Sequence, residues 1–155
     1  VYNGHVYSGA VKKGDYISAK LNINQANFTG NSASSKVYVI DDNRYPSNYG
    51  LYYNQHITLY VGKGGAIYNS LTYNSNSEKY QNNYASGGIV QGGAVYNSGN
   101  FTISGDSIYL NNKAVSSKTQ SNVFDADGGA IYNSGTLNAV SATSLKFMQN
   151  QHLML

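Results

Sequence analysis

Apolar and polar residues alternate along this chain in short runs, and no run keeps a helical rhythm. Leu21-Asn22-Ile23 alternates as a half-buried strand does, and residues 37–40 and 57–61 are β-prone runs bounded by turn residues. Nowhere do apolar residues recur at i, i+3, i+4 and i+7 over a dozen residues, because Gly and Asn interrupt every candidate helix. The pattern predicts an all-β fold of short strands, which is compatible with a sandwich, a barrel or a solenoid.

One phrase occurs three times in the second half of the chain. Residues 64–70 read Gly-Gly-Ala-Ile-Tyr-Asn-Ser, and residues 92–98 and 128–134 repeat it with Val or Ile at the fourth position. The copies start 28 and then 36 residues apart. A phrase that recurs every 20–50 residues or so is typical of a stacked architecture, in which each repeat buries its apolar face against its neighbours. The two glycines permit a positive φ or the close approach of another coil.

A second phrase follows each copy of the first: an aromatic residue, two variable residues and an Asn. It occupies residues 80–83, 109–112 and 147–150, which begin 16, 17 and 19 residues after the double glycine. Weaker forms of the two phrases are found at residues 8–11 and 28–31. The paired phrases predict three clear repeats behind a degenerate one, and they favour a solenoid over a sandwich or a barrel.

The predicted fold is a parallel β-helix of about five to six coils, in which each repeat forms about one coil. We interpret residues 1–155 as a single β-helix domain or fragment, with a degenerate repeat at 8–35, an irregular coil with a loop at 36–63, and regular repeats at 64–91, 92–127 and 128–155. The irregular coil is inferred from the distance between Gly9 and Gly65, which is 56 residues, or twice the next interval of 28.

Equivalent residues of neighbouring repeats are expected to stack as ladders inside the coils. The aliphatic residues of the first phrase should form an apolar ladder, the aromatic residues of the second phrase an aromatic one, and the asparagines at the bend an amide ladder. The structural motif residues are Gly64, Gly65, Ala66, Ile67, Asn69, Tyr80, Asn83, Gly92, Gly93, Ala94, Val95, Asn97, Tyr109, Asn112, Gly128, Gly129, Ala130, Ile131, Asn133, Phe147 and Asn150.

The composition changes this picture mainly by exclusion. At 155 residues the chain is one domain by size, and only 11% of residues are charged, with a net charge of +3. Its ten basic residues are scattered, which argues against a nucleic-acid partner. It has no cysteine, so neither a disulfide framework nor a thiolate metal site is available. We see no apolar run of the roughly 18–20 residues that a membrane helix needs, no starting Met and no signal segment, and we expect a piece of a longer protein.

The two phrases are similar to the paired motifs of the chlamydial-type polymorphic outer membrane protein repeat. The resemblance covers residues 64–150 closely and residues 8–31 loosely, while Tyr80 and Tyr109 replace the usual Phe and residues 36–63 carry no motif. It implies a right-handed, single-stranded parallel β-helix in the passenger region of an autotransporter-like protein, extracellular or at the bacterial cell surface. Members of that family act as adhesins that contact host cells.

An enzyme is the main alternative class, because parallel β-helices also host polysaccharide lyases and glycosidases. Such sites need carboxylates clustered on one face. Asp41 and Asp42 with Arg44 form the best cluster, but turn formation explains it more simply. Asp125 and Asp127 resemble a fragment of a calcium loop, although calcium takes about six or more oxygen ligands. The three histidines, at 5, 56 and 152, have no ligand spacing, so we predict no catalytic residue, no metal and no cofactor.

Tyrosine is the informative surplus, with 16 copies in the chain. Exposed Tyr with Asn and Ser makes an adaptable binding surface, and the densest group, a possible ligand surface, is Tyr45, Tyr49, Tyr52 and Tyr53. Tyr68, Tyr96 and Tyr132 fit a structural ladder better. The predicted function is an adhesin or structural stalk that binds a host or neighbouring-cell surface protein or glycan. The alternatives are an extracellular filament that self-associates through its coil ends and, further behind, a carbohydrate-active enzyme.

Overall fold

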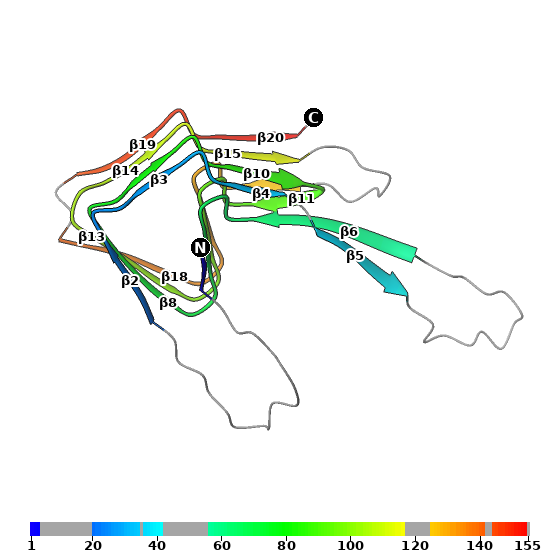
Figure 1. Ribbon diagram of the computed structural model, residues 1–155, viewed down its shortest axis with the longest axis horizontal. Coiled ribbons are helices and arrows are strands. Elements are labelled where there is room, and N and C mark those ends of the chain that lie inside the picture. The colour runs from blue at the N-terminus through cyan, green and yellow to red at the C-terminus, as the bar shows by residue number, and fades with distance from the viewer. Residues whose placement is uncertain (4–19, 35, 42–55, 117–124, 142–143, 155) are drawn as a thin grey trace, which may run out of the picture.

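The computed structural model describes residues 1–3, 20–34, 36–41, 56–116, 125–141 and 144–154, with side chains described outside residues 36–60. Every element in these ranges is a strand, and the strands wind as stacked coils around a common interior (Figure 1). Five sheets line the coils, and each contains four strands. We name them A to E.

Sheets A, B and C hold the strands on either side of the first bend of each coil. Sheet A contains β1 (Tyr2–Asn3), β7 (Ile67–Asn69), β12 (Val95–Asn97) and β17 (Ile131–Asn133). Sheet B contains β2 (Lys20–Asn24), β8 (Thr72–Asn76), β13 (Asn100–Ser104) and β18 (Thr136–Val140). Sheet C contains β3 (Asn27–Thr29), β9 (Lys79–Gln81), β14 (Ser107–Leu110) and β19 (Leu145–Met148).

Sheets D and E complete each coil. Sheet D contains β4 (Ser32–Ser34), β10 (Tyr84–Gly87), β15 (Lys113–Ser116) and β20 (Gln151–Met154). Sheet E contains β5 (Lys36–Asp41), β6 (His56–Lys63), β11 (Ile89–Gln91) and β16 (Asp125–Asp127). The pairs between coils are parallel and keep repeat against repeat, for example Val95 beside Ile67 on one side and Ile131 on the other. The predicted class, an all-β parallel β-helix, is therefore confirmed.

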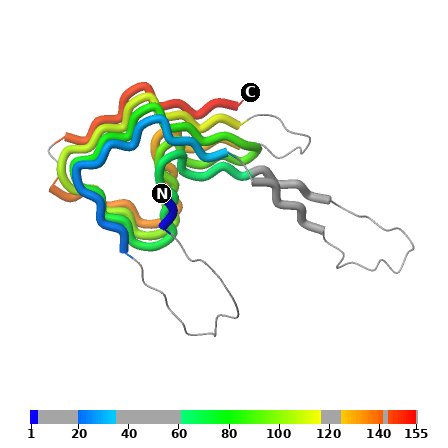
Figure 2. The backbone as a smooth tube through the Cα atoms, in the orientation of Figure 1, coloured from blue at the N-terminus to red at the C-terminus, as the bar shows by residue number. Residues whose placement is uncertain are grey.

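The first coil lies directly on the second. Strand β2 pairs with β8 and β4 pairs with β10, so no further coil lies between them. Residues 36–41 and 56–63, which we expected to belong to an additional irregular coil, instead form β5 and β6, paired antiparallel as a hairpin arm that extends from sheet E (Figure 2). The sheets of the described chain are thus four strands deep, fewer than the five to six coils expected from spacing. The spacing misled because an arm lengthens a repeat as much as a coil does.

Three bends in each coil use a residue in the left-handed region. Between sheets B and C these are Gln25, Ser77, Gly105 and Ser141, and between C and D they are Gly30, Asn82, Asn111 and Gln149. Between sheets E and A they are the first glycines of the repeated phrase, with φ of 62° at Gly64, 77° at Gly92 and 62° at Gly128. Gly and Asn tolerate this conformation best, which explains their abundance at the bends.

The second glycine of the phrase is needed for a different reason. A Cβ atom on Gly93 would overlap the carbonyl oxygen of Gly129 in the next coil and would lie 2.6 Å from the backbone of Lys113 in sheet D. A Cβ on Gly65 would meet Gly93 and Tyr84 in the same way. The bend therefore packs backbone against backbone, which no side chain permits.

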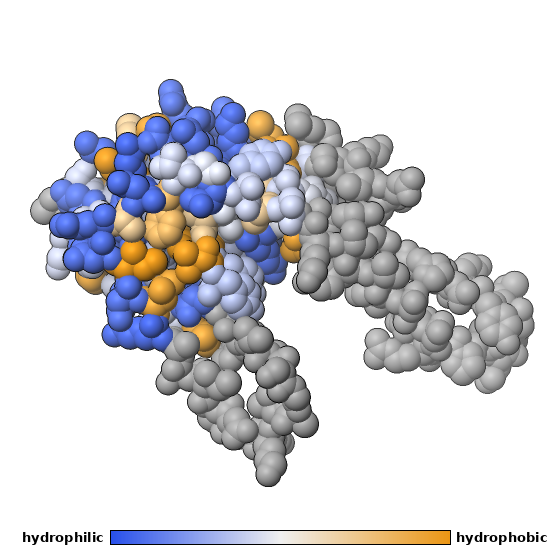
Figure 3. Space-filling model, viewed as in Figure 1, coloured by the Kyte–Doolittle hydropathy of each residue, from blue (hydrophilic) through white to orange (hydrophobic). Residues whose placement is uncertain are grey.

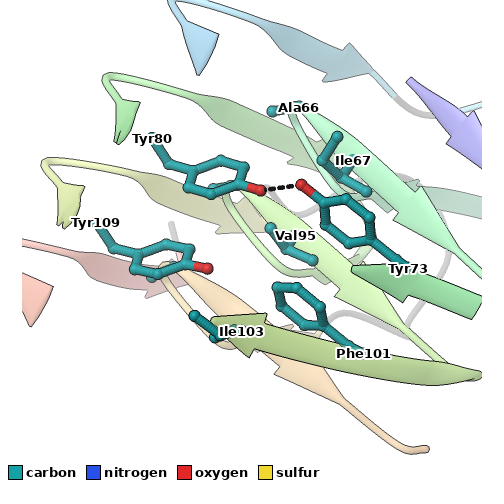
Figure 4. Close-up of a cluster of buried hydrophobic side chains, with 10 residues drawn as sticks. Ala66, Ile67, Tyr73, Tyr80, Val95, Phe101, Ile103 and Tyr109 are labelled. Atoms are coloured by element: carbon teal, nitrogen blue, oxygen red, sulfur yellow. Dashed lines mark hydrogen bonds between the residues drawn. The ribbon is translucent and has the colours of Figure 1, made fainter. Parts of the chain in front are cut away.

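The interior is built from ladders of inward-facing side chains. Ile67 and Val95 are fully buried, and Phe28, Tyr80, Tyr109 and Phe147 stack in one aromatic column with ring centroids 4.7–5.0 Å apart. Figure 4 shows Tyr80 and Tyr109 lying parallel, with Tyr73 beside them over Phe101. The last coil exposes its interior residues, including Leu137 at 39% and Phe147 at 51%. Figure 3 shows apolar residues in the middle of the cross-section, ringed by hydrophilic ones.

Candidate binding surface

Two amide ladders hold the bends on either side of the candidate surface. In the first, Asn3, Asn69 and Asn97 each donate from Nδ2 to Oδ1 of the Asn in the next coil, at 2.7, 2.6 and 2.5 Å, and the ladder ends at Asn133. Asn69 and Asn97 are fully buried. The amide ladder expected from the sequence is therefore present. Since alternate residues of a strand point to opposite faces, burying these asparagines turns the preceding tyrosines outward.

The second amide ladder lies at the bend between sheets C and D. Asn31, Asn83 and Asn112 donate from Nδ2 to the Oδ1 atoms of Asn83, Asn112 and Asn150, at 3.0, 2.8 and 2.9 Å. Each Oδ1 in this ladder also accepts the backbone N–H of the preceding coil's Asn, at 3.0–3.1 Å. This double contact explains why the second phrase ends in Asn rather than in any small polar residue.

A column of tyrosines runs along the outer side of sheet A. Tyr2, Tyr68, Tyr96 and Tyr132 stack with centroid distances of 4.8, 4.9 and 5.5 Å and interplanar angles of 9°, 17° and 7°. Tyr2 is 58% exposed, Tyr68 and Tyr132 are half-buried, and Tyr96 is 7% exposed. We call these four residues the tyrosine column. The ladder interpretation of Tyr68, Tyr96 and Tyr132 agrees with this geometry.

A lysine marks the middle of the tyrosine column. Lys63 Nζ lies 4.4 Å from the ring centroid of Tyr96 and donates to its Oη at 3.1 Å. Burial by itself raises the pKa of Tyr96, but hydrogen bonds from Lys63, Ser98 and Ser134 and the charge of Lys63 outweigh it, so the pKa lies below its usual value. Tyr96 is thus a polarised phenol within an aromatic stack.

Sheet B presents a flat polar surface next to the tyrosine column. Its outward positions form three rows across the coils, made almost entirely of Asn, Thr and Ser: Lys20, Thr72, Asn100, Thr136; Asn22, Asn74, Thr102, Asn138; and Asn24, Asn76, Ser104, Val140. Asn74 donates to Asn22 Oδ1 at 2.8 Å across the surface. We call these twelve residues the amide face. It offers many neutral donors and acceptors and only one charge, which suits an uncharged polar ligand.

A buried polar cluster was missed by the sequence reasoning. The hydroxyls of Tyr73 and Tyr80 both donate to Glu78 Oε2 at 2.5 Å and contact each other, and Glu78 is only 1% exposed. Burial raises the pKa of Tyr80 and of Tyr109, and the neighbouring charged groups raise both further. Strand alternation placed Glu78 two residues before the inward Tyr80, and this was the available signal.

The cluster is confined to the middle of the stack. The Glu78 position is occupied by Ala26 in the first coil, Ser107 in the third and Leu145 in the fourth. Glu78 Oε1, Tyr109 Oη and Ser75 Oγ have no hydrogen-bond partner among the described residues. The cluster is enclosed and lacks access to a substrate, so its consequence is for stability.

The acids considered for catalysis or calcium are not gathered. Asp125 and Asp127 point outward from β16 on either side of the buried Ala126, and Lys63, Gln91 and Asp127 form one outward row. No group of three His, Cys, Asp or Glu in the described ranges is arranged to hold a metal ion. Asp42 and Arg44 lie outside the described residues, as do the predicted ligand tyrosines Tyr45, Tyr49, Tyr52 and Tyr53.

Comparisons with known proteins bear on the architecture. Within the described ranges, no helix has the length and apolar character that crossing a membrane requires. No curated protein and no solved structure matched the chain. A match to a protein family was found over residues 25–70, to the Chlamydia polymorphic membrane protein (Chlamydia_PMP) repeat.

The matched segment begins just before the degenerate aromatic phrase at residues 28–31 and ends with the first double-glycine phrase at residues 64–70. The family's name places it at a membrane, which agrees coarsely with an outer-membrane or cell-surface protein. Both kinds of motif that build the bends of this β-helix thus lie within the match, and residues 25–70 carry a Chlamydia polymorphic membrane protein repeat, the repeat that the two phrases resemble.

Proposed function

We propose that this chain is a non-catalytic β-helix of a secreted or surface-displayed protein, an adhesin or stalk that binds through the tyrosine column and the amide face. One observation supports the proposal above the others: outward side chains of the same kind repeat in register on every described coil. A rigid row of identical groups suits an extended partner, such as a surface protein or glycan of a host or neighbouring cell, because the partner meets the same chemistry at every coil.

The proposal is tested by placing charge on the amide face. Asn74→Lys with Thr102→Lys adds two cations at neighbouring, partly exposed positions of sheet B, and should reduce the binding of chain-coated beads to cells at least tenfold. The matched control is Gln81→Lys with Leu110→Lys, which adds the same charges on the outer side of sheet C. Equal binding by both double variants and the unmodified chain would exclude the amide face. Equal loss in both would show that charge alone acts.

A filament subunit is the second candidate, and the coil ends support it. Each ladder finishes in the same kind of residue at both ends of the stack, with Asn3 and Asn133, Asn31 and Asn150, and Phe28 and Phe147. A second copy stacked head to tail would therefore continue every ladder, and such a contact does not close. Negative-stain electron microscopy with a mass measurement decides between the candidates. Long unbranched fibres favour the filament, and single-chain rods favour the stalk or adhesin.

A further inference from the structure

The tyrosine column brings four phenols of different coils into direct contact at the surface. Its rings are nearly parallel, and the closest pairs, Tyr2 with Tyr68 and Tyr68 with Tyr96, have centroids 4.8 and 4.9 Å apart. We propose that the column is an oxidative modification site, at which tyrosines of neighbouring coils are joined as dityrosine. The strand register holds each pair opposite one another, so coupling needs only side-chain movement.

The chemistry requires an oxidant, which we name as a peroxide acting with a peroxidase. Each of two phenols loses one electron and one proton to give a tyrosyl radical. The two radicals form a carbon–carbon bond between ring positions ortho to the hydroxyls, and the rings regain aromaticity by moving those ortho hydrogens to the oxygens. The two electrons and two protons reduce one hydrogen peroxide to two waters, so two tyrosines and one peroxide give one dityrosine and two waters.

Exposure decides which stacked tyrosines are open to this reaction. Tyr2 is 58% exposed and Tyr68 and Tyr132 are half-buried, so a surface oxidant reaches the column at several points. Tyr80 and Tyr109 stack at 4.7 Å inside the coils, but both are fully buried. The interior pair therefore has the geometry without the access, and serves as a control within the same molecule.

Tyr96 is the residue on which the column depends. It contacts both Tyr68 and Tyr132, and without it those two lie two coils apart. The Lys63 ammonium at 3.1 Å from its oxygen favours loss of the phenol proton, which oxidation requires. A covalent bond from Tyr96 to Tyr68 would close a loop of 28 residues across two coils, as a disulfide does in other proteins.

The experiment treats dilute chain with peroxidase and hydrogen peroxide and maps the monomer fraction after trypsin digestion. Cleavage after Lys63, Lys79, Lys113, Lys118 and Lys146 places Tyr68, Tyr96 and Tyr132 in three separate peptides, 64–79, 80–113 and 119–146. We expect dityrosine fluorescence, together with a linked pair 64–79/80–113 that has lost two hydrogens. Fragment spectra should place this link at Tyr68 and Tyr96, and the linked chain should melt at a higher temperature.

Two variants separate the column from other tyrosines. Tyr96→Phe keeps a stacked ring and should abolish links from 80–113 to both neighbouring peptides. Tyr84→Phe, at a 39% exposed position outside the column, should leave those links unchanged. The proposal is overturned if native chain yields no such link while peroxidase couples N-acetyltyrosine, if dityrosine forms only at other tyrosines, or if Tyr96→Phe retains the link. It is also overturned if chain unfolded in denaturant gives the same pairs in the same yield.

Discussion

At the scale of single residues, the two glycines of the repeated phrase do different work. The first adopts a positive φ, as at Gly64 and Gly92, while the second leaves room for the backbone of the next coil and of sheet D. The sequence reasoning named both possibilities for the pair but could not assign them, because the assignment depends on which strands approach the bend. A substitution that adds only a Cβ separates the two roles.

Gly93→Ala should destabilise the chain far more than Gly30→Ala. Gly30 has φ of 67° but open space around its missing Cβ, so alanine there costs about 1–2 kcal/mol of conformational strain. Alanine at Gly93 would overlap the backbones of Gly129 and Lys113, and should cost more than about 4 kcal/mol. Urea unfolding of both variants measures the difference. Equal losses would contradict the assigned role of the second glycine.

The interior tyrosines predict a dependence of stability on pH. Burial raises the pKa of Tyr73, Tyr80 and Tyr109 in the folded chain, whereas tyrosines of the unfolded chain ionise near pH 10 or so. A raised folded pKa means that this stability is fully present below about pH 10 and is lost as the pH rises further. Each residue should contribute a loss of about 1.4 kcal/mol per pH unit above that point.

Tyr109→Phe should therefore make the alkaline loss of stability shallower, by about a third of the combined effect of the three residues. It also removes a hydroxyl that is buried without a partner among the described residues. Tyr84→Phe, at an exposed position, is the control and should keep the native slope. Urea midpoints between pH 8 and 11.5 or so provide the measurement. A slope unchanged by Tyr109→Phe would contradict the buried, neutral state of this phenol.

At the scale of elements, the coils are joined by ladders that cross every sheet. Asn97 illustrates the principle, since it bonds to Asn69, to Asn133 and to the carbonyl oxygens of Gly99 and Thr136. Its amide serves two coils at once, and removing it leaves buried groups of both without a partner. Inner and outer ladders should therefore differ in energetic weight although they look alike in sequence.

Asn97→Ala should cost about 2–4 kcal/mol of unfolding free energy, because the buried amides on either side lose partners. Asn74→Ala removes an equivalent amide pair on the exposed amide face and should cost less than about 0.5 kcal/mol. Denaturant unfolding compares the two variants under identical conditions. If both cost the same, burial does not set the strength of these ladders.

How far the sequence could predict these elements follows from what repeats in it. The inner ladders could be foreseen, since Ile67, Asn69 and Tyr80 recur with their spacing intact. The hairpin arm could not, because the spacing of 56 residues fits an extra coil equally well. Glu78 could not either, because it occurs in one repeat only and a polar residue in a polar chain gives no sign of burial.

At the scale of the whole molecule, the stack presents long regular sides and two open ends. The last coil exposes residues that are fully buried one coil earlier: Phe101 and Tyr109 are at 0%, whereas Leu137 and Phe147 are at 39% and 51%. The ends are therefore apolar inside a polar rim, which another coil would cover. The sides, in contrast, are finished surfaces, and the adhesin proposal depends on them.

Phe147→Asp separates these two parts of the account. Because Phe147 is half exposed, the substitution should lower stability by less than about 2 kcal/mol while it prevents head-to-tail stacking. The mass in solution should become independent of protein concentration, and cell binding should persist if the sides carry it. Loss of binding together with loss of association would show that binding needs the assembled form.

The central claim is that the coils stack in parallel and in register, and engineered cysteines test it most directly because the chain has none. Asn74→Cys with Thr102→Cys places two thiols on register partners of neighbouring strands, within the roughly 4.4–6.8 Å Cα separation of a disulfide. Asn74→Cys with Asn138→Cys places them two coils apart, about 10 Å, which is too far. The account predicts fast intramolecular disulfide formation in the first variant and none in the second. No disulfide in the first, or equal formation in both, would contradict the β-helix described here.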